Sequence, residues 1–332
     1  MENLSEKTML IYDSSLSSDI RLDEFMNSQP IEFDGYVFHK QFRDPKGNSG
    51  SNPTWGELYE IKNGTITNLG KGVYKEYDYD EPDGSYAEKL YSMLAKRVLD
   101  KQIRVPNITL VKDSKSKETG IFSHIILDND TEDMMEIKAL LFSVYDREKQ
   151  KNMKSLVVYQ DLLNAIKEEV HDEECFAKIE KQVVQTLLLD AFANNADRHA
   201  RNWALIRDKE TNEYNLGLFD HAVSFLDIIS PRQLATNGTR WTNTYILTEE
   251  KKQIYGLGED GKKVLKYLFK RYPEYSEEFI KNLEKELPGF LKEAKSMPGA
   301  IKSRSFESTL TAKCRGLRKI LESQRSGEEY YD

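Results

Sequence analysis

The chain has 332 residues, of which 39% are hydrophobic and 31% charged, with a formal net charge of −8. This length allows one large domain or two smaller ones, the acidic balance argues against direct nucleic-acid binding, and two cysteines are too few for a disulfide framework. No apolar run reaches the ~18 residues of a membrane span, and the amino terminus lacks a secretory pattern. We therefore expect a cytoplasmic protein without membrane contact. Export by a specialised secretion system would leave the same sequence pattern.

The first part of the chain is predicted to be rich in β-strands. Residues 1–29 are polar and are expected to form an N-terminal arm. The Asn63-Gly64 pair is typical of a tight hairpin turn. Short runs of aromatic and β-branched residues predict strands at 35–42, 57–61, 64–69, 72–77, 105–111 and 120–128.

A polar loop that contains Gly47, Gly50 and Gly56 lies between the first two of these strands. Glycines let backbone N–H groups approach phosphates closely, so we assign Gly50, Ser51 and Asn52 to nucleotide binding. Because the glycines follow no fixed spacing, a plain hairpin loop is the alternative.

Lys75 and Glu88 form the next candidate pair. Lys75 falls in the predicted strand 72–77, and Glu88 lies in the first turn of an amphipathic helix at 85–100. A buried Lys–Glu pair would hold Lys75 against nucleotide phosphates. The alternatives are a solvent-facing lysine and a glutamate that only favours the helix amino terminus.

The second part of the chain is predicted to be mainly helical. The acidic segment 128–136 is expected to be a loop near the boundary between two lobes. Apolar residues at helical spacing predict helices at 156–170, 176–193, 262–270, 275–287 and 304–321. The tail 326–332 is expected to lack structure.

The stretch from Leu187 to Leu226 carries the strongest functional pattern. An apolar helix leads into a polar loop with Asp197, His199 and Asn202, and a predicted hairpin then returns the chain to Asp220. This arrangement suits phosphoryl transfer, in which Asp197 orients the nucleophile and Asn202 and Asp220 hold Mg²⁺ through oxygen atoms. We also assign His199 to nucleotide binding. Taken one by one, these residue types are ordinary in loops.

The strings NNADRHARNWAL and GLFDHAVSF resemble the catalytic and metal-binding loops of HipA-like bacterial kinases. The Asp-Arg-His-x-x-Asn string is also similar to that of phosphoinositide lipid kinases. The resemblance implies that Asp197 is the catalytic base and that Asn202 and Asp220 are metal ligands. Many kinases follow the metal aspartate with Phe-Gly, whereas this chain has His221-Ala222.

The resemblance implies an α+β, two-lobed protein-kinase-like fold. We expect a small β-rich N-lobe at 30–128 that binds the nucleotide and a larger, mainly helical catalytic C-lobe at 129–325. The expected activity is transfer of the γ-phosphoryl group of ATP, with Mg²⁺, to Ser or Thr of a protein substrate.

Some HipA-like kinases also modify serines in their own Gly-rich loop, and Ser49 and Ser51 stand in the matching place. The resemblance is compatible with an antitoxin-like partner. A lipid kinase and a catalytically silent nucleotide-binding module are the alternatives. The basic residues after Asp220 are scattered rather than clustered, which argues against the lipid kinase.

Overall fold

The structure is a computed structural model that describes residues 31–40, 54–63, 65–77, 83–112, 119–128, 130–144, 157–229, 246–247, 261–297 and 305–327. The predicted arm, most of the Gly-rich loop with Gly50, Ser51 and Asn52, and the last residues of the tail lie outside the described residues. The chain divides into two compact units, which comprise residues up to Ser85 with Asn107–Ile125, and Tyr86–Pro106 with Ile126 onward. The chain therefore passes between the units three times, and the last passage is close to the boundary expected near residue 128.

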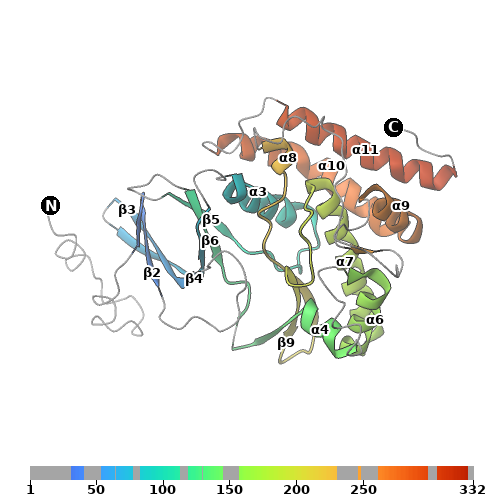
Figure 1. Ribbon diagram of the computed structural model, residues 1–332, viewed down its shortest axis with the longest axis horizontal. Coiled ribbons are helices and arrows are strands. Elements are labelled where there is room, and N and C mark those ends of the chain that lie inside the picture. The colour runs from blue at the N-terminus through green and yellow to red at the C-terminus, as the bar shows by residue number, and fades with distance from the viewer. Residues whose placement is uncertain are drawn as a thin grey trace. The chain divides into compact units, whose positions relative to one another are not determined.

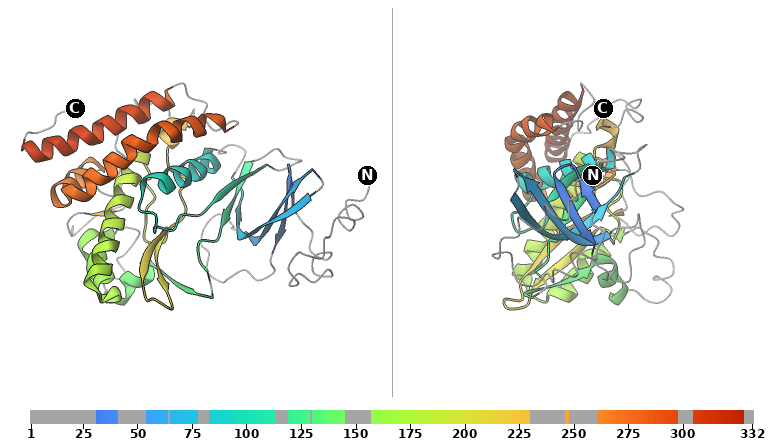
Figure 2. Two further views of the ribbon diagram at one scale, coloured as in Figure 1. Left: turned by 180° about the vertical axis from the view of Figure 1, so that it is seen from behind. Right: turned by 90° about the vertical axis from the view of Figure 1, so that its left-hand side faces the viewer.

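The first unit is built on one six-stranded antiparallel sheet in the order β1-β2-β3-β4-β6-β5. Its first strands are the blue arrows in Figure 2. Its strands are β1 (Ile31–Phe33), β2 (Tyr36–Lys40), β3 (Thr54–Lys62), β4 (Thr65–Lys75), β5 (Ile108–Lys112) and β6 (Thr119–His124). Its core contains the aromatic side chains of Phe38, Tyr74 and Phe122, one from each of three strands. Apart from β1, each strand contains or overlaps a predicted strand.

The two strands predicted at 64–69 and 72–77 are one continuous strand, β4. Leu58 of β3 pairs with Gly70, and the next residue, Tyr59, pairs with Asn68, so β4 carries one extra residue. Gly70 has φ +96, which a glycine adopts at little cost, and its N–H donates to Asn68 Oδ1 at 2.6 Å. Gly70 therefore lies at a β-bulge within one continuous strand.

Gly56 was expected in the flexible polar loop, and that expectation is wrong. It lies in β3, paired in register with Gly72 of β4. A Cβ atom at Gly56 would overlap the ring of Phe38 and the carbonyl oxygen of His39. The absence of a side chain at Gly56 therefore serves the packing of aromatic rings against the sheet.

The second unit is mainly helical (Figure 1). Its helices are α3 (Asp83–Val98, which starts in the first unit), α4 (Ile137–Val144), α6 (Tyr159–Val170), α7 (Glu173–Ala193), α8 (Leu226–Ile229), α9 (Gly261–Arg271), α10 (Pro273–Ser296) and α11 (Phe306–Ser326). The long helix α7 packs against α6, α9, α10, α11 and β10. Most of its length is buried, and it runs through the hydrophobic core of this unit.

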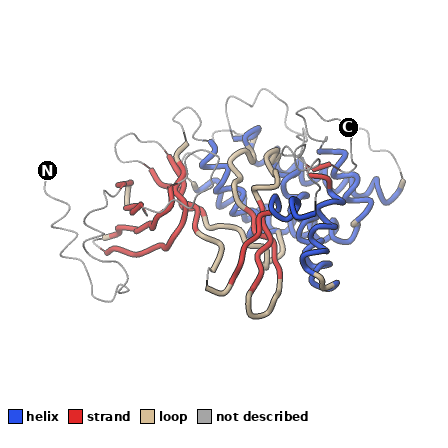
Figure 3. Tube along the Cα trace, turned by 60° about the horizontal axis from the view of Figure 1, so that its bottom comes forward, coloured by secondary structure: helices blue, strands red, loops and turns tan. Residues whose placement is uncertain are grey.

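Two small sheets complete the second unit. The strands β7 (Glu132–Glu136), β9 (Trp203–Asp208) and β10 (Tyr214–Leu218) form an antiparallel sheet in the order β10-β9-β7. Figure 3 distinguishes the strands of the chain, in red, from its helices, in blue. The two-residue strands β8 (Val157–Val158) and β11 (Ile246–Leu247) pair in parallel.

The expectation of a loop at 128–136 is wrong over the residues of β7. Glu132 is buried, and one of its carboxylate oxygens accepts from Arg104 Nη2 at 2.6 Å while the other accepts from the Asp128 N–H at 2.9 Å. Arg207 Nη2 on β9 donates to Asp133 at 2.9 Å. Partners elsewhere in the unit compensate the acidic charges, which local composition could not indicate.

Helix α10 extends well beyond its predicted end at residue 287. It continues through Pro288 to Ser296, although a proline inside a helix costs about 3 kcal/mol. Phe290, Leu291 and Ala294 lie beyond the proline and are buried in the core. The burial of these side chains offsets the missing backbone hydrogen bond. None of the helices described is long and apolar enough to cross a membrane.

We predict that Gly56→Ala destabilises the first unit. The added methyl group has to displace an aromatic ring or the backbone, so the free energy of unfolding should fall by about 1–3 kcal/mol. Equilibrium denaturant unfolding measures this change. Thr65→Ala, at an exposed position of the same strand pair, is the control and should shift stability by no more than about 0.5 kcal/mol. Equal effects of both substitutions would contradict the packing role of Gly56.

Candidate active site

The polar loop begins where α7 ends. Asp172 caps the amino terminus of the helix by accepting from the Cys175 N–H at 2.7 Å. At the other end Asn194 adopts the left-handed conformation with φ +52, a conformation that asparagine tolerates better than most residues. The chain leaves the helix at this point and enters the loop that carries Asp197 and Asn202.

Asp197 and Asn202 are held together by hydrogen bonds within this loop. Asn202 Nδ2 donates to the carbonyl oxygen of Asp197 at 2.7 Å and approaches its carboxylate Oδ2 at 3.4 Å. The His199 N–H donates to Asp197 O, and the Asn202 N–H donates to His199 O. Because the amide nitrogen of Asn202 is bound to Asp197, its Oδ1 is the atom oriented for a metal ligand.

The hairpin of β9 and β10 returns the chain to this loop, as the sequence predicted. Trp203 pairs with Leu218 at the open end of the hairpin, and the Phe219 N–H donates to Asn202 O at 3.1 Å. Asp220 follows directly, in the left-handed conformation with φ +58. The structure thus brings Asp197, Asn202 and Asp220 together at the open end of the hairpin, where the chain enters β9 and leaves β10.

The electrostatics of Asp197 reflect its neighbours. Burial raises its pKa, the charge of His199 lowers it, and repulsion from the Asp220 carboxylate raises it, while Arg198 and the hydrogen bond from Asn202 lower it; the net direction is upward. Two carboxylates that repel each other favour a bound cation. The structure therefore provides a negatively charged site next to an oriented amide oxygen.

The donor set fits Mg²⁺. Among the described residues there is no group of three or more His, Cys, Asp or Glu side chains that could hold a metal ion by itself. Mg²⁺ is commonly held by one or two carboxylates together with substrate phosphates and water. Asp220 and the Oδ1 of Asn202 would hold such an ion and leave positions for a nucleotide.

His199 is linked to Asp197 through its backbone N–H, and its ring lies farther from the Asp197 carboxylate. Its Nε2 is 3.9 Å from Asp197 Oδ2, and its Nδ1 accepts from the Arg201 N–H at 3.2 Å. About a quarter of its side chain is exposed. Its assignment to nucleotide binding stays a prediction.

Glu88 and Lys75 lie in different units. Lys75 is the half-buried last residue of β4, and their predicted pairing stays a prediction. Glu88, on α3, is 1% exposed, and its Oε2 accepts from the His221 N–H at 2.9 Å. Glu88 therefore contacts the residue that follows Asp220, a contact that the sequence did not predict.

Sequence reasoning missed a buried polar cluster behind this loop. We call Tyr91, Asp190, Arg198 and His221 the inner polar cluster. Arg198 and His221 are both 0% exposed, and Arg198 stands inside the Asp-Arg-His string without having been given a role. The string was the available sequence clue, but a charged residue type gives no indication of complete burial.

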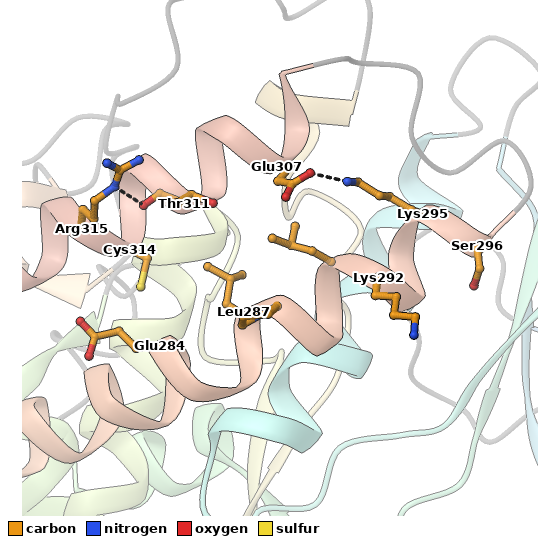
Figure 4. Close-up of a pocket in the computed structure, with 11 residues that line it drawn as sticks. Glu284, Leu287, Lys292, Lys295, Ser296, Glu307, Thr311, Cys314 and Arg315 are labelled. Atoms are coloured by element: carbon orange, nitrogen blue, oxygen red, sulfur yellow. Dashed lines mark hydrogen bonds and ion pairs between the residues drawn. The ribbon is translucent and has the colours of Figure 1, made fainter.

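A groove of about 700 Å³ lies between α10 and α11, away from these residues. Figure 4 shows Leu287 of α10 and Cys314 of α11 along it, with the Lys295–Glu307 ion pair linking the two helices. None of the predicted site residues lines it. We therefore assign it no part in the chemistry.

No protein-family model matches the chain, and no curated protein matches its sequence. Among solved structures the fold is similar to that of the Helicobacter pylori proinflammatory kinase CtkA, with a TM-score of 0.56 at 12% identity over 87% of this chain and 95% of that chain. A HipA, HipB and operator DNA complex of the toxin–antitoxin system of Shewanella oneidensis MR-1 matches with a TM-score of 0.45 at 13% identity, over 94% of this chain and 74% of that chain.

The similarity to CtkA confirms the predicted α+β, two-lobed kinase-like fold. The resemblance that the loop sequences suggested is therefore supported as far as a kinase-like fold. At such low identity the roles of individual residues stay predictions.

We predict that Asp197→Asn makes the protein without nucleotide more stable at neutral pH. Because the pKa of Asp197 is raised in the folded state, the ionised carboxylate opposes folding above that pKa. The opposing contribution vanishes below the unfolded-state pKa, near ~3.9. The stability gain of the variant should thus be present at pH 7 and disappear in strong acid, as measured by thermal unfolding across pH.

Asp208→Asn is the control, for which we expect the opposite change in stability. Backbone hydrogen bonds from Thr211 and Glu210 hold the pKa of Asp208 below its ordinary value. Its substitution should therefore reduce stability at neutral pH, and the loss should shrink as the pH falls through the folded-state pKa. If Asp197→Asn instead destabilises the protein at pH 7, the interpretation of the Asp197 environment is wrong.

Proposed function

We propose that this protein is an ATP- and Mg²⁺-dependent kinase that transfers the γ-phosphoryl group to Ser or Thr of a protein substrate. The observation that carries the proposal is the convergence of Asp197, Asn202 and Asp220 at the open end of the β9–β10 hairpin. The kinase-like fold supports it. A catalytically silent module would not need an oriented amide and two mutually repelling carboxylates.

In this proposal Asp197 accepts the proton of the attacking hydroxyl group. The new bond joins the hydroxyl oxygen to the γ-phosphorus, the bond from that phosphorus to the β,γ-bridging oxygen breaks, and ADP leaves. The raised pKa of Asp197 makes it a stronger base than an ordinary aspartate. Asp220 and Asn202 would hold Mg²⁺, which when bound neutralises charge on the phosphates.

The remaining assignments belong to the same proposal. Lys75 contacts the nucleotide phosphates, and Glu88 helps to position it. Gly50, Ser51, Asn52 and His199 complete the nucleotide site. An antitoxin-like partner, suggested by the sequence resemblance, would be identified by co-purification from its native host.

We predict that Asp197→Ala impairs phosphoryl transfer alone, whereas Asp220→Ala also impairs ATP binding. Asp197→Ala should lower transfer of labelled phosphate from ATP by about 100- to 10,000-fold, as loss of a general base does, while Mg²⁺-dependent ATP binding is retained. Asp220→Ala should lose the Mg²⁺-dependent part of ATP binding as well. Autophosphorylation and a general protein acceptor provide the transfer assay, and calorimetry measures binding.

Asp208→Ala, at the far end of the same hairpin, is the matched control and should keep both properties. Transfer by Asp197→Ala at the wild-type rate would contradict the proposed chemistry. Transfer to phosphoinositide vesicles, with none to protein, would favour the lipid-kinase alternative.

We further predict autophosphorylation in the Gly-rich loop, at Ser49 or Ser51. A phosphate there adds nearly two negative charges where the phosphates of ATP are expected to bind, so ATP affinity should fall after modification. Intact-mass analysis and peptide mapping after incubation with ATP and Mg²⁺ test this. Asp197→Ala should show no added mass, and absence of phosphate on residues 47–54 of the wild type would count against it.

A further inference from the structure

The guanidinium group of Arg198 is buried and fully hydrogen-bonded. Nε donates to Asp190 Oδ2 at 2.9 Å, and Nη2 donates to Asp190 Oδ1 at 3.1 Å and to His221 Nδ1 at 2.9 Å. Nη1 donates to the carbonyl oxygens of Asn202 and Phe219 at 2.6 and 3.1 Å. Arginine has five N–H donors in a rigid plane, and each of these five contacts can use one of them.

Two of these acceptors belong to the segments that carry the predicted metal ligands. One is the backbone of Asn202 itself, and the other is Phe219, the residue before Asp220. Because both carbonyl oxygens bind the same nitrogen, their separation is set by the guanidinium group. Arg198 therefore fixes the catalytic loop relative to the end of β10, which no flexible point charge such as lysine would do.

Asp190 holds the guanidinium group in this orientation. It lies near the end of α7 and is 4% exposed. In addition to Arg198, its Oδ1 accepts from Tyr91 Oη at 2.7 Å and from Asn195 Nδ2 at 2.8 Å. The buried charge of Arg198 is thereby compensated, and its plane is fixed from the side of α7.

Tyr91 connects the inner polar cluster to α3. Its ring stacks on His221 with centroids 4.0 Å apart and an interplanar angle of 22°. Since arginine cannot accept a hydrogen bond, Nδ1 of His221 is the acceptor and the neutral ring carries its proton on Nε2. Glu88 binds the backbone N–H of the same histidine. The residue after Asp220 is therefore held through both its ring and its backbone.

We propose that Asp190 and Tyr91 are positioning residues for the metal-binding carboxylate and amide, acting through Arg198 and His221. The inference rests on the proposed function. It assigns a reason for His221 in the place where many kinases have phenylalanine: a ring nitrogen gives the guanidinium group its fifth acceptor. The two residues hold Asn202 and Asp220 at a fixed separation before any nucleotide binds.

The test compares Tyr91→Phe and Asp190→Asn with the wild type. Tyr91→Phe keeps the ring that stacks on His221 and removes only the hydroxyl group. Tyr159→Phe is the matched control, because Tyr159 is equally buried, lies on α6 and is outside the inner polar cluster. Both tyrosine variants remove one buried hydroxyl group from the second unit.

The first measurement is binding of a non-hydrolysable ATP analogue with and without Mg²⁺. Tyr91→Phe should weaken the Mg²⁺-dependent part of the affinity by about ten-fold, the lower end of the effect of residues that orient metal ligands. Asp190→Asn should weaken it further. Binding without Mg²⁺ should change little, and Tyr159→Phe should match the wild type in both conditions.

The second measurement is amide hydrogen exchange of the protein without nucleotide or metal. Tyr91→Phe should speed exchange in residues 194–202 and 219–225 and leave β9 and β10 unchanged. Uniformly faster exchange, or weaker binding with and without Mg²⁺ alike, would indicate a general structural role and overturn the inference. Unchanged exchange in both segments would overturn it as well.

The two measurements separate this inference from the proposed function. If the wild type shows no Mg²⁺-dependent nucleotide binding, the proposed function fails. The exchange experiment still decides whether Asp190 and Tyr91 hold the two segments in place. If exchange changes as expected but the Mg²⁺-dependent affinity of Tyr91→Phe equals that of the wild type, the positioning of metal ligands is overturned while the proposed function stands.

Discussion

The candidate site depends on the buried ion pair between Asp190 and Arg198. A pair of this kind contributes little net stability, because both charges lose their hydration, yet removal of one partner costs about 3–5 kcal/mol. What the pair provides here is geometry. The carboxylate at the end of α7 orients a planar group, and that group binds the backbone on both sides of the site. The position of α7 in the core therefore determines the position of the loop that carries Asp197.

The same region contains an unfavourable arrangement of charge. Burial and the neighbouring carboxylate of Asp220 both raise the pKa of Asp197, only partly offset by His199 and Arg198. Asp220 itself adopts a left-handed backbone conformation that most residues avoid. Such costs persist where the surrounding structure compensates for them, and they concentrate at functional sites. They are consistent with a site whose favourable partner is a cation bound with a nucleotide.

Most elements could be predicted from local pattern, and the exceptions share a cause. Apolar spacing predicted α3, α7 and α11, and the Asn63-Gly64 turn predicted the β3–β4 hairpin. The local sequence pattern predicted the wrong structure where contacts with residues distant in the chain determined it. The acidic strand β7 pairs with β9, Gly56 leaves room for a ring of another strand, and α10 continues through Pro288 because its last turns are buried.

For the site, the sequence by itself predicted which residues could supply oxygen ligands and determined that a hairpin would bring Asp220 back to Asp197 and Asn202, because turn chemistry and strand pattern are local properties. Only the tertiary structure decided that Arg198 is buried, that Asp190 and Tyr91 hold it, and that Glu88 contacts the His221 backbone. Tyr91 and Asp190 are 99 positions apart in the chain, and Glu88 and His221 are 133 apart. Such contacts arise when side chains of α3 and α7 meet in a common core, and no local pattern encodes them.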